Sequence, residues 1–124
     1  MIALEISGLG AFCWQHLVLD LNGTLALDGV LLEGVAPRVA ALARDLEVHL
    51  LTADTHGTGA RVAAELGLAL HRLAPAQGGE ARQKGEFVAA LGAQGVIAIG
   101  NGNNDAEMLR LASLGIAVLG PEGA

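Results

Sequence analysis

Short apolar stretches alternate with stretches of helical periodicity along most of this chain, and that alternation constrains the fold more than any other feature. The apolar runs have the length of strands. The stretches between them repeat apolar residues every three or four positions, as at Val35, Val39, Leu42 and Leu46. Strands that alternate with helices form a parallel sheet, and because each crossover is right-handed, helices cover both faces. The sequence therefore predicts a three-layer, doubly wound α/β fold.

The bounds of these elements follow from the pattern. We expect strands at 2–6, 16–21, 48–53, 68–73, 96–99 and 115–119, and helices at 35–46, 58–66, 80–91 and 105–112. Asp28 and Gly29 indicate a small hairpin after the first core strand. Because the chain has 124 residues and no recognisable linker, we expect one domain, residues 1–124.

The charge balance argues against two classes of partner. The net charge is −6, whereas a general nucleic-acid-binding protein needs a basic surface, so we expect no nucleic-acid partner. Residues 6–19 contain no Lys, Arg, Asp or Glu, but they are too few to span a bilayer and are expected as buried strand material. We therefore expect no membrane partner.

Two features of the N-terminal region favour a cytoplasmic protein. Residues 1–8 lack the basic region of a signal peptide. Cys13 is the only cysteine, so no intramolecular disulfide can form, which fits a reducing compartment. Cys13 itself is expected to be a small buried hydrophobic residue.

Polar residues stand where the predicted strands end. Asp20 ends the first core strand, Thr52 ends the second, and Gly100 and Asn101 end the fourth, while Lys84 lies on the preceding helix. In doubly wound sheets, ligands bind outside the carboxyl ends of the strands. A carboxylate, a hydroxyl, a lysine and an asparagine-rich loop gathered there suit phosphoryl transfer, because they supply a nucleophile, phosphate donors and oxygen ligands for a metal.

Each of these residues also has an ordinary structural interpretation. Thr52 fits a strand, Lys84 fits a solvated helix face, and residues 101–105 fit a turn followed by a helix N-cap. Two glycines and three asparagines within six residues are more than a cap requires. The functional hypothesis therefore depends on the conjunction of these residues.

The same segments resemble the four motifs of the haloacid dehalogenase (HAD) superfamily. Residues 20–25, Asp-Leu-Asn-Gly-Thr-Leu, resemble the first motif, and residues 50–54, Leu-Leu-Thr-Ala-Asp, resemble the second. Lys84 stands where the third-motif lysine is expected, and residues 100–105, Gly-Asn-Gly-Asn-Asn-Asp, resemble the fourth. The sequence looks closest to small proteins related to the phosphorylation domain of P-type ATPases. The resemblance implies a HAD-like Rossmannoid fold, here without a cap domain.

This resemblance implies a Mg²⁺-dependent phosphatase in which Asp20 attacks phosphorus and forms an aspartyl-phosphate. The catalytic residues that it implies are Asp20, Asn22, Thr52 and Lys84. The substrate-binding residues that it implies are Thr52, Ala53, Lys84 and Asn104. The Mg²⁺ ligands that it implies are Asp20, the backbone carbonyl of Asn22, Asn101 and Asp105.

Two positions depart from the family pattern. Asn22 replaces the aspartate that protonates the leaving group and activates water, and an amide cannot do this acid–base work, worth roughly 10²- to 10⁴-fold in rate. Asn101 replaces a metal-binding aspartate with a weaker, neutral ligand. We therefore expect slow turnover. Two alternatives stay open: a regulatory module that binds phosphate or a partner without turnover, and a phospho-accepting switch.

The sequence leaves the substrate unnamed and assigns no role to several notable residues. Without a cap, the site is open to a phosphorylated small molecule or macromolecule, and the high apolar fraction is compatible with a homo-oligomer. Trp14 is expected in the core or an interface. Four histidines show no metal-ligand spacing and are expected to be structural or exposed: His16, His49, His56 and His71.

Overall fold

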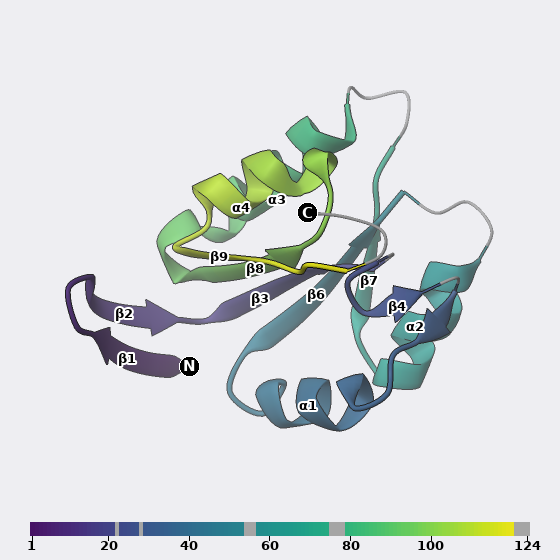
Figure 1. Cartoon of the computed structure of the whole chain (residues 1–124), viewed down its shortest axis with the longest axis horizontal. Helices are drawn as coiled ribbons and strands as arrows, with labels where there is room; N and C mark the ends of the chain where they lie inside the picture. The colour runs from purple at the N-terminus through teal and green to yellow at the C-terminus, as the bar shows by residue number, and fades with distance from the viewer. Residues whose placement is uncertain (22, 28, 54–56, 75–78, 121–124) are drawn as a thin grey trace.

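A five-stranded parallel sheet forms the centre of the computed structural model, which describes residues 1–21, 23–27, 29–53, 57–74 and 79–120. The strand order is β7-β6-β3-β8-β9 (Figure 1). The strands are β3 (His16–Asp20), β6 (Glu47–Thr52), β7 (Ala69–Arg72), β8 (Val96–Gly100) and β9 (Leu114–Ala117). All four neighbouring pairs are parallel, which confirms the predicted α/β sheet.

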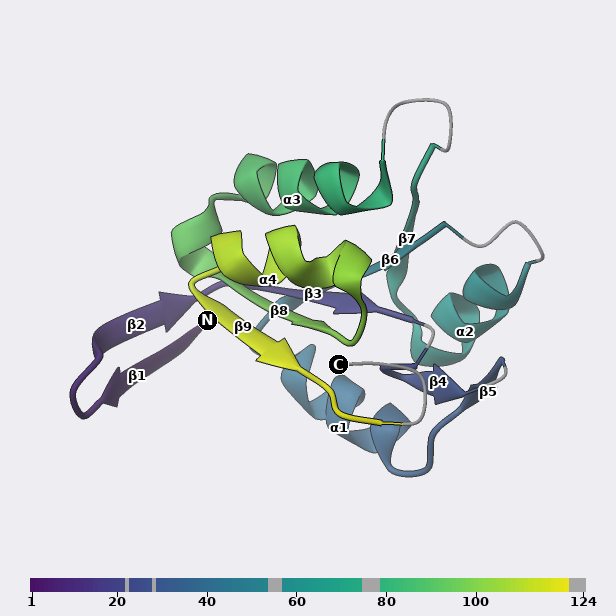
Figure 2. The ribbon, with the colours of Figure 1, turned by 45° about the horizontal axis from the view of Figure 1, so that its top comes forward.

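Helices cover both faces of this sheet. The α-helices are α1 (Val35–Leu42), α2 (Thr58–Leu66), α3 (Glu80–Leu91) and α4 (Ala106–Leu111). Two 3₁₀ turns, η2 (Ala93–Gly95) and η3 (Asn103–Asp105), flank β8. Figures 1 and 2 show α3 and α4 on one face and α1 and α2 on the other. The fold is therefore three-layered, as predicted.

Side chains along the central strands point alternately to the two faces of the sheet, and each face carries its own hydrophobic cluster. On β3, Leu17 and Leu19 pack with α1 and α2, while Val18 packs with α3 and α4. Successive side chains of a strand point to opposite faces, so a strand covered on both faces must be apolar throughout. That requirement explains the run Leu17-Val18-Leu19, each residue of which is at most 2% exposed. The polar residue that ends this run is Asp20.

Two small hairpins flank the sheet. β1 (Ile2–Ile6) pairs with β2 (Gly10–Trp14), and β4 (Ala26–Leu27) pairs with β5 (Val30–Leu31). The second is the hairpin predicted after the first core strand, although Asp28 at its turn lies outside the described residues. The first projects from one end of the sheet (Figures 1 and 2).

The β1–β2 hairpin corrects two sequence-based expectations. Residues 6–19 were expected to be buried, yet most of β2 is exposed because β2 pairs only with β1 and lies outside the two helical layers. Cys13 is exposed for the same reason. Trp14, where β2 meets the sheet, is 2% exposed and donates to Ser113 Oγ at 3.2 Å, so it does belong to the core.

Element bounds otherwise differ from the predicted ones by a few residues. The largest difference is at α1, which ends at Leu42 rather than at 46, because the chain continues in turns to Leu46. Leu46 is still 4% exposed, so its apolar character is explained by burial outside the helix. In the described part of the chain, every helix is too short or too polar to cross a membrane.

Candidate active site

The polar residues at the carboxyl ends of the strands line one cavity of about 430 Å³. Asp20 is the last residue of β3, Thr52 is the last of β6, and Asn101 directly follows β8. These strands are neighbours, so their carboxyl ends meet at one edge of the sheet. The residues that line the cavity are Asp20, Thr52, Ala53, Glu80, Lys84, Asn101, Gly102 and Asn104.

The structure therefore brings together most of the residues that the sequence singled out. Six of them line the cavity, and a seventh, Asp105, is fully buried and hydrogen-bonded to two of the six, Lys84 and Asn101. Asn22 lies outside the described residues, so its predicted part in the site stays a prediction.

Lys84 connects two of the acidic residues. Its Nζ donates to Asp20 Oδ1 at 3.0 Å and to Asp105 Oδ1 at 2.6 Å. It is 1% exposed, although the sequence also allowed a solvated position. Lys84 is the only lysine in the chain. A lysine is rarely buried without a partner, because removing its charge from water costs several kcal/mol. Two carboxylates offset that cost here.

The buried carboxylate of Asp105 positions both Lys84 and the loop that follows β8. Its Oδ2 accepts the backbone N–H of Asn101 at 3.0 Å and that of Gly102 at 3.1 Å, while its Oδ1 accepts from Lys84. The sequence predicted Asp105 as a metal ligand. Both of its oxygens are already engaged and the residue does not line the cavity, so the geometry favours a positioning role instead.

Burial and charge pairing act in opposite directions on the two central ionisable groups of the site. Burial raises the pKa of Asp20 from 3.8 to about 6, against the opposing attraction of Lys84. For Lys84, burial lowers the pKa, but attraction by Asp20 and hydrogen bonding to Asp105 outweigh it, so the net pKa is raised. With both carboxylates ionised, one ammonium faces two negative charges. The site thus carries an excess negative charge that a cation would neutralise.

The cavity offers oxygen ligands for such a cation. Asp20 supplies a carboxylate and Asn101 supplies an amide oxygen, and both side chains line the cavity. Oxygen ligands suit hard divalent cations such as Mg²⁺, which commonly use one or two carboxylates.

Two further residues contribute to the site without having been assigned to it from the sequence. Thr24 Oγ1 donates to Asn101 Oδ1 at 3.4 Å, with both residues buried. Glu80 lines the cavity and accepts a hydrogen bond from the Asn104 side chain. The available signals were the place of Thr24 in the first motif-like segment and that of Glu80 one helical turn before Lys84.

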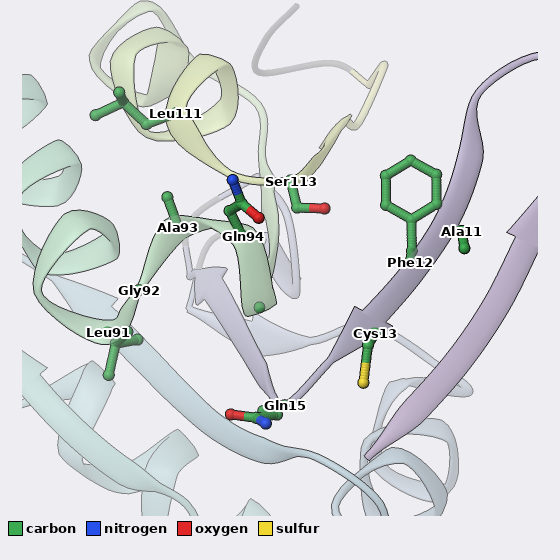
Figure 3. A pocket seen from close by; sticks show the side chains of 11 residues that line it. Ala11, Phe12, Cys13, Gln15, Leu91, Gly92, Ala93, Gln94, Leu111 and Ser113 are labelled. Carbon is green, nitrogen blue, oxygen red and sulfur yellow. The ribbon is translucent and has the colours of Figure 1, made fainter.

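A larger hollow elsewhere lacks groups for this chemistry. It measures about 710 Å³ and lies between β2, the α3–β8 connection and the end of α4. Figure 3 shows Phe12, Cys13 and Gln15 on one side of it and Leu91, Gln94 and Ser113 among the others that line it. No described residue that lines it is acidic or basic. The smaller cavity therefore remains the candidate active site.

Comparisons with known proteins agree with this geometry. A family model described as haloacid dehalogenase-like hydrolase matches residues 88–119, which include β8 and the loop that follows it. The chain is also 49% identical over 39 residues to the uncharacterized protein MJ0072 of Methanocaldococcus jannaschii. That match takes in 32% of this chain and 89% of the relative.

Solved structures share the fold. A HAD family hydrolase of Streptomyces avermitilis matches with 19% identity and a TM-score of 0.62, over 81% of this chain and 64% of that protein. A phosphoserine phosphatase matches with 17% identity and a TM-score of 0.68, over 85% of this chain and 86% of that one. The 3-deoxy-D-manno-octulosonate 8-phosphate phosphatase of Moraxella catarrhalis matches with 18% identity and a TM-score of 0.67, over 90% and 70%.

This chain spans just under two thirds of the Streptomyces hydrolase. At identities below a fifth, these likenesses establish the fold and leave the reaction to be argued from the site. The family model, the shared fold and the motif residues gathered at one sheet edge point in the same direction. This chain has the fold of haloacid dehalogenase-like hydrolases, and its residues 88–119 match their family model.

Proposed function

We propose that this chain is a divalent-cation-dependent phosphatase that transfers a phosphoryl group to Asp20. One observation carries the proposal: the only lysine of the chain is buried beside the cavity and donates to both Asp20 and Asp105. Such a group both orients a carboxylate nucleophile and supplies positive charge for an anionic substrate. A purely structural lysine would not need a place at the carboxyl end of the sheet.

Asp20 would act as the nucleophile. A bond forms between one of its carboxylate oxygens and phosphorus while the bond from phosphorus to the leaving oxygen breaks. Water then attacks phosphorus, which releases inorganic phosphate and regenerates the carboxylate. The phosphoserine phosphatase that shares this fold was solved as an analogue of a phospho-aspartyl intermediate, which supports the same chemistry here.

The phosphoryl oxygens need donors around Asp20. The proposed donors are the Thr52 hydroxyl, the Asn104 amide and the Lys84 ammonium, with Ala53 beside Thr52 on the cavity wall. Fixed donors aimed at a phosphoryl group lower the barrier because they need no reorganisation during the reaction. Asp105 would hold Lys84 and the backbone of Asn101 and Gly102 in that orientation.

Mg²⁺ is the proposed cofactor. Asp20 and Asn101 would hold it, together with the backbone carbonyl of Asn22 that the family resemblance implies. When bound, the cation would supply positive charge beside the phosphoryl oxygens. The phosphatase of Moraxella catarrhalis was solved with a magnesium ion and a phosphate ion, which supports this choice of metal.

Turnover is proposed to be slow. Asn22 cannot protonate a leaving group or activate water, so substrates with poor leaving groups should lose roughly 10²- to 10⁴-fold in rate. The amide of Asn101 should weaken cation binding relative to a carboxylate. The same two residues favour a second candidate function, a regulatory or phospho-accepting module in which Asp20 binds or retains phosphate without rapid release.

We also propose that residues 1–124 form one domain that works in the cytoplasm on a phosphorylated small molecule or macromolecule, without a nucleic-acid or membrane partner. Several large apolar side chains are exposed, among them Leu9 at 70% and Leu119 at 78%, which is compatible with a homo-oligomer. The likeness to P-type ATPase phosphorylation domains stays part of this proposal.

An aryl phosphate tests the chemistry, because its good leaving group needs little acid help. We expect Mg²⁺-dependent phosphate release by the wild type and none by Asp20→Ala. Asp45 is an exposed aspartate between α1 and β6, so the control variant Asp45→Ala should keep full activity. Because an aspartate at position 22 could activate water for the second step, Asn22→Asp should raise turnover by about tenfold or more. A folded Asn22→Asp variant with unchanged turnover would contradict the acid–base argument.

The same experiment separates the two candidate functions. Phosphate release that depends on Asp20 supports the phosphatase. A hydroxylamine-sensitive phosphoryl group that stays on wild-type protein and is absent from Asp20→Ala supports the phospho-accepting module. If neither signal appears in folded protein, the nucleophilic role of Asp20 is wrong.

A further inference from the structure

Three histidines that are far apart in the sequence lie in a row across neighbouring strands. His16 is on β3, His49 is on β6 and His71 is on β7, three strands that lie side by side (Figure 1). His16 Nδ1 is 3.2 Å from His49 Nε2, and His49 Nδ1 is 3.3 Å from His71 Nε2. The sequence showed no metal-ligand spacing among the histidines. The fold brings these three together instead.

The register of the sheet explains this convergence. His16 pairs with Glu47 across the parallel β3–β6 ladder. Glu47 and His49 are two residues apart on β6, so their side chains point to the same face. Two imidazoles and one carboxylate therefore meet at the amino ends of two adjacent strands. Short-range sequence patterns cannot show such a group, because it depends on which strands pair and in which register.

The spacing of these three side chains matches a metal coordination sphere. His16 Nδ1 is 3.5 Å from Glu47 Oε2, and the three ligand atoms all lie within 4.8 Å of one another. Neighbouring ligands of a tetrahedral Zn²⁺, bound at about 2.0 Å, are about 3.3 Å apart. The distance between His16 and His49, 3.2 Å, is close to that value. Within the part of the chain that the structure describes, no other group of His, Cys, Asp and Glu converges in this way.

We propose that His16, Glu47 and His49 form a second metal site, for a divalent transition metal such as Zn²⁺. Imidazole nitrogens with a carboxylate suit Zn²⁺ and its neighbours in the first transition row, whereas Mg²⁺ prefers oxygen ligands alone. The site lies at the amino ends of β3 and β6, and the candidate active site lies beyond their carboxyl ends. The two sites thus differ in both place and ligand chemistry.

The surroundings prepare His49 for this role. If Nε2 binds the metal, Nδ1 of the neutral ring carries the proton and donates to His71 Nε2, which fixes the tautomer and the ring orientation. Phe87 from α3 packs against both rings, with centroids 5.5 Å from His49 and 4.6 Å from His71.

A metal bound here would join β3 to β6. Asp20 and Thr52 are the last residues of these same two strands, at the ends away from the metal. The metal would therefore stabilise the scaffold of the active site without touching it. A ligand that binds only the folded state raises its stability in proportion to the logarithm of ligand concentration over Kd. The expected signature is therefore a Zn²⁺-dependent rise in melting temperature that persists when the active site is disabled.

Calorimetric titration with ZnCl₂ tests the proposal, on tag-free protein and with excess Mg²⁺ present. We expect one Zn²⁺ per chain for the wild type and for Asp20→Asn. His16→Gln and Glu47→Gln should each weaken binding by at least about tenfold. His56→Gln is the matched control for histidine removal, and its affinity should equal that of the wild type.

Three outcomes would overturn the proposal. They are the absence of Zn²⁺ binding by the wild type, unchanged affinity in both His16→Gln and Glu47→Gln, and loss of binding in Asp20→Asn. Because the two substituted residues are partly or largely exposed, with side-chain exposures of 17% and 69%, both variants should fold. Far-ultraviolet circular dichroism of each variant checks this directly.

Discussion

The carboxylate of Asp105 occupies the space that a side chain at Gly100 would need. A Cβ built at Gly100 would lie 2.6 Å from both Cγ and Oδ2 of Asp105, far inside van der Waals contact. Asp105 is fully buried and bonded to Lys84 and to two backbone N–H groups, so it cannot move aside cheaply. The glycine that ends β8 is therefore required by the acid five residues later.

Replacement of Gly100 by alanine should damage the site more than the fold. We expect Gly100→Ala to displace Asp105, to lower aryl phosphatase activity by about tenfold or more, and to destabilise the protein by about 1–3 kcal/mol through overpacking. Activity assays and urea unfolding measure the two effects. Gly120→Ala is the control, because a Cβ there meets no atom within 4 Å. Equal behaviour of the two variants would argue against the close contact.

The two carboxylates that Lys84 contacts should differ in their effect on stability. Asp105→Asn leaves the buried ammonium with one charged partner and disturbs the backbone loop, so we expect a loss of up to about 3–5 kcal/mol. Asp20→Asn leaves a neutral Lys84–Asp105 pair and removes a carboxylate that burial disfavours, so we expect little or no loss. Chemical denaturation without divalent cations compares them. A larger loss for Asp20→Asn would contradict this assignment.

The stability of the metal-free protein should depend on pH through Asp20. Its pKa rises from 3.8 to about 6 on folding, so the folded state binds the proton more tightly. The stabilising contribution is therefore complete below the unfolded pKa and is lost as pH rises through the folded one. Between about pH 4 and about pH 7, wild type should lose at most about 3 kcal/mol relative to Asp20→Asn.

Denaturation of both proteins in the presence of a chelator measures this difference, and the comparison cancels the other titrating groups. Added Mg²⁺ should reduce it, because a cation next to Asp20 favours the ionised form. A wild-type stability that changes with pH in parallel with Asp20→Asn would show that burial does not disfavour this carboxylate.

Amine labelling should report the burial of Lys84. The chain has one lysine, so its amines are Lys84 and the N-terminus of Met1. Lys84 is 1% exposed and held as an ion pair with a raised pKa, whereas Met1 is 66% exposed. We expect reductive methylation to modify only the N-terminus of the folded protein and both amines after unfolding. Mass spectrometry reads out the sites, and rapid labelling of Lys84 in folded protein would contradict its burial.

Much of this fold could be predicted because its strands are buried on both faces. A strand such as Leu17-Val18-Leu19 must be apolar throughout, so its polar end at Asp20 is visible in the sequence, and the same holds at Thr52. Parallel topology then places both ends at one edge. The site follows from the positions of a few strand ends.

The rest depended on pairing and register, which local patterns do not specify. The ligand atoms of His16 and His49 come within 3.2 Å only because residues 16–20 pair in parallel with residues 47–51. The family resemblance implied that Asp105 binds a metal. The sequence cannot show that both of its carboxylate oxygens already accept hydrogen bonds, from Lys84 and from two backbone N–H groups. The prediction that β2 is buried was wrong. A run without charged residues indicates a buried strand, but the sequence does not show which elements pack against it.

The central position of β3 has a consequence for synthesis of the protein. Its partners are β6, which follows it closely in the chain, and β8, which ends at Gly100. While the nascent chain is still on the ribosome, one edge of β3 stays unpaired until β8 emerges, and unpaired strand edges promote association between chains. Asp105 emerges five residues after Gly100, so the pairing of Lys84 with both Asp20 and Asp105 forms only after all of β8 has been made.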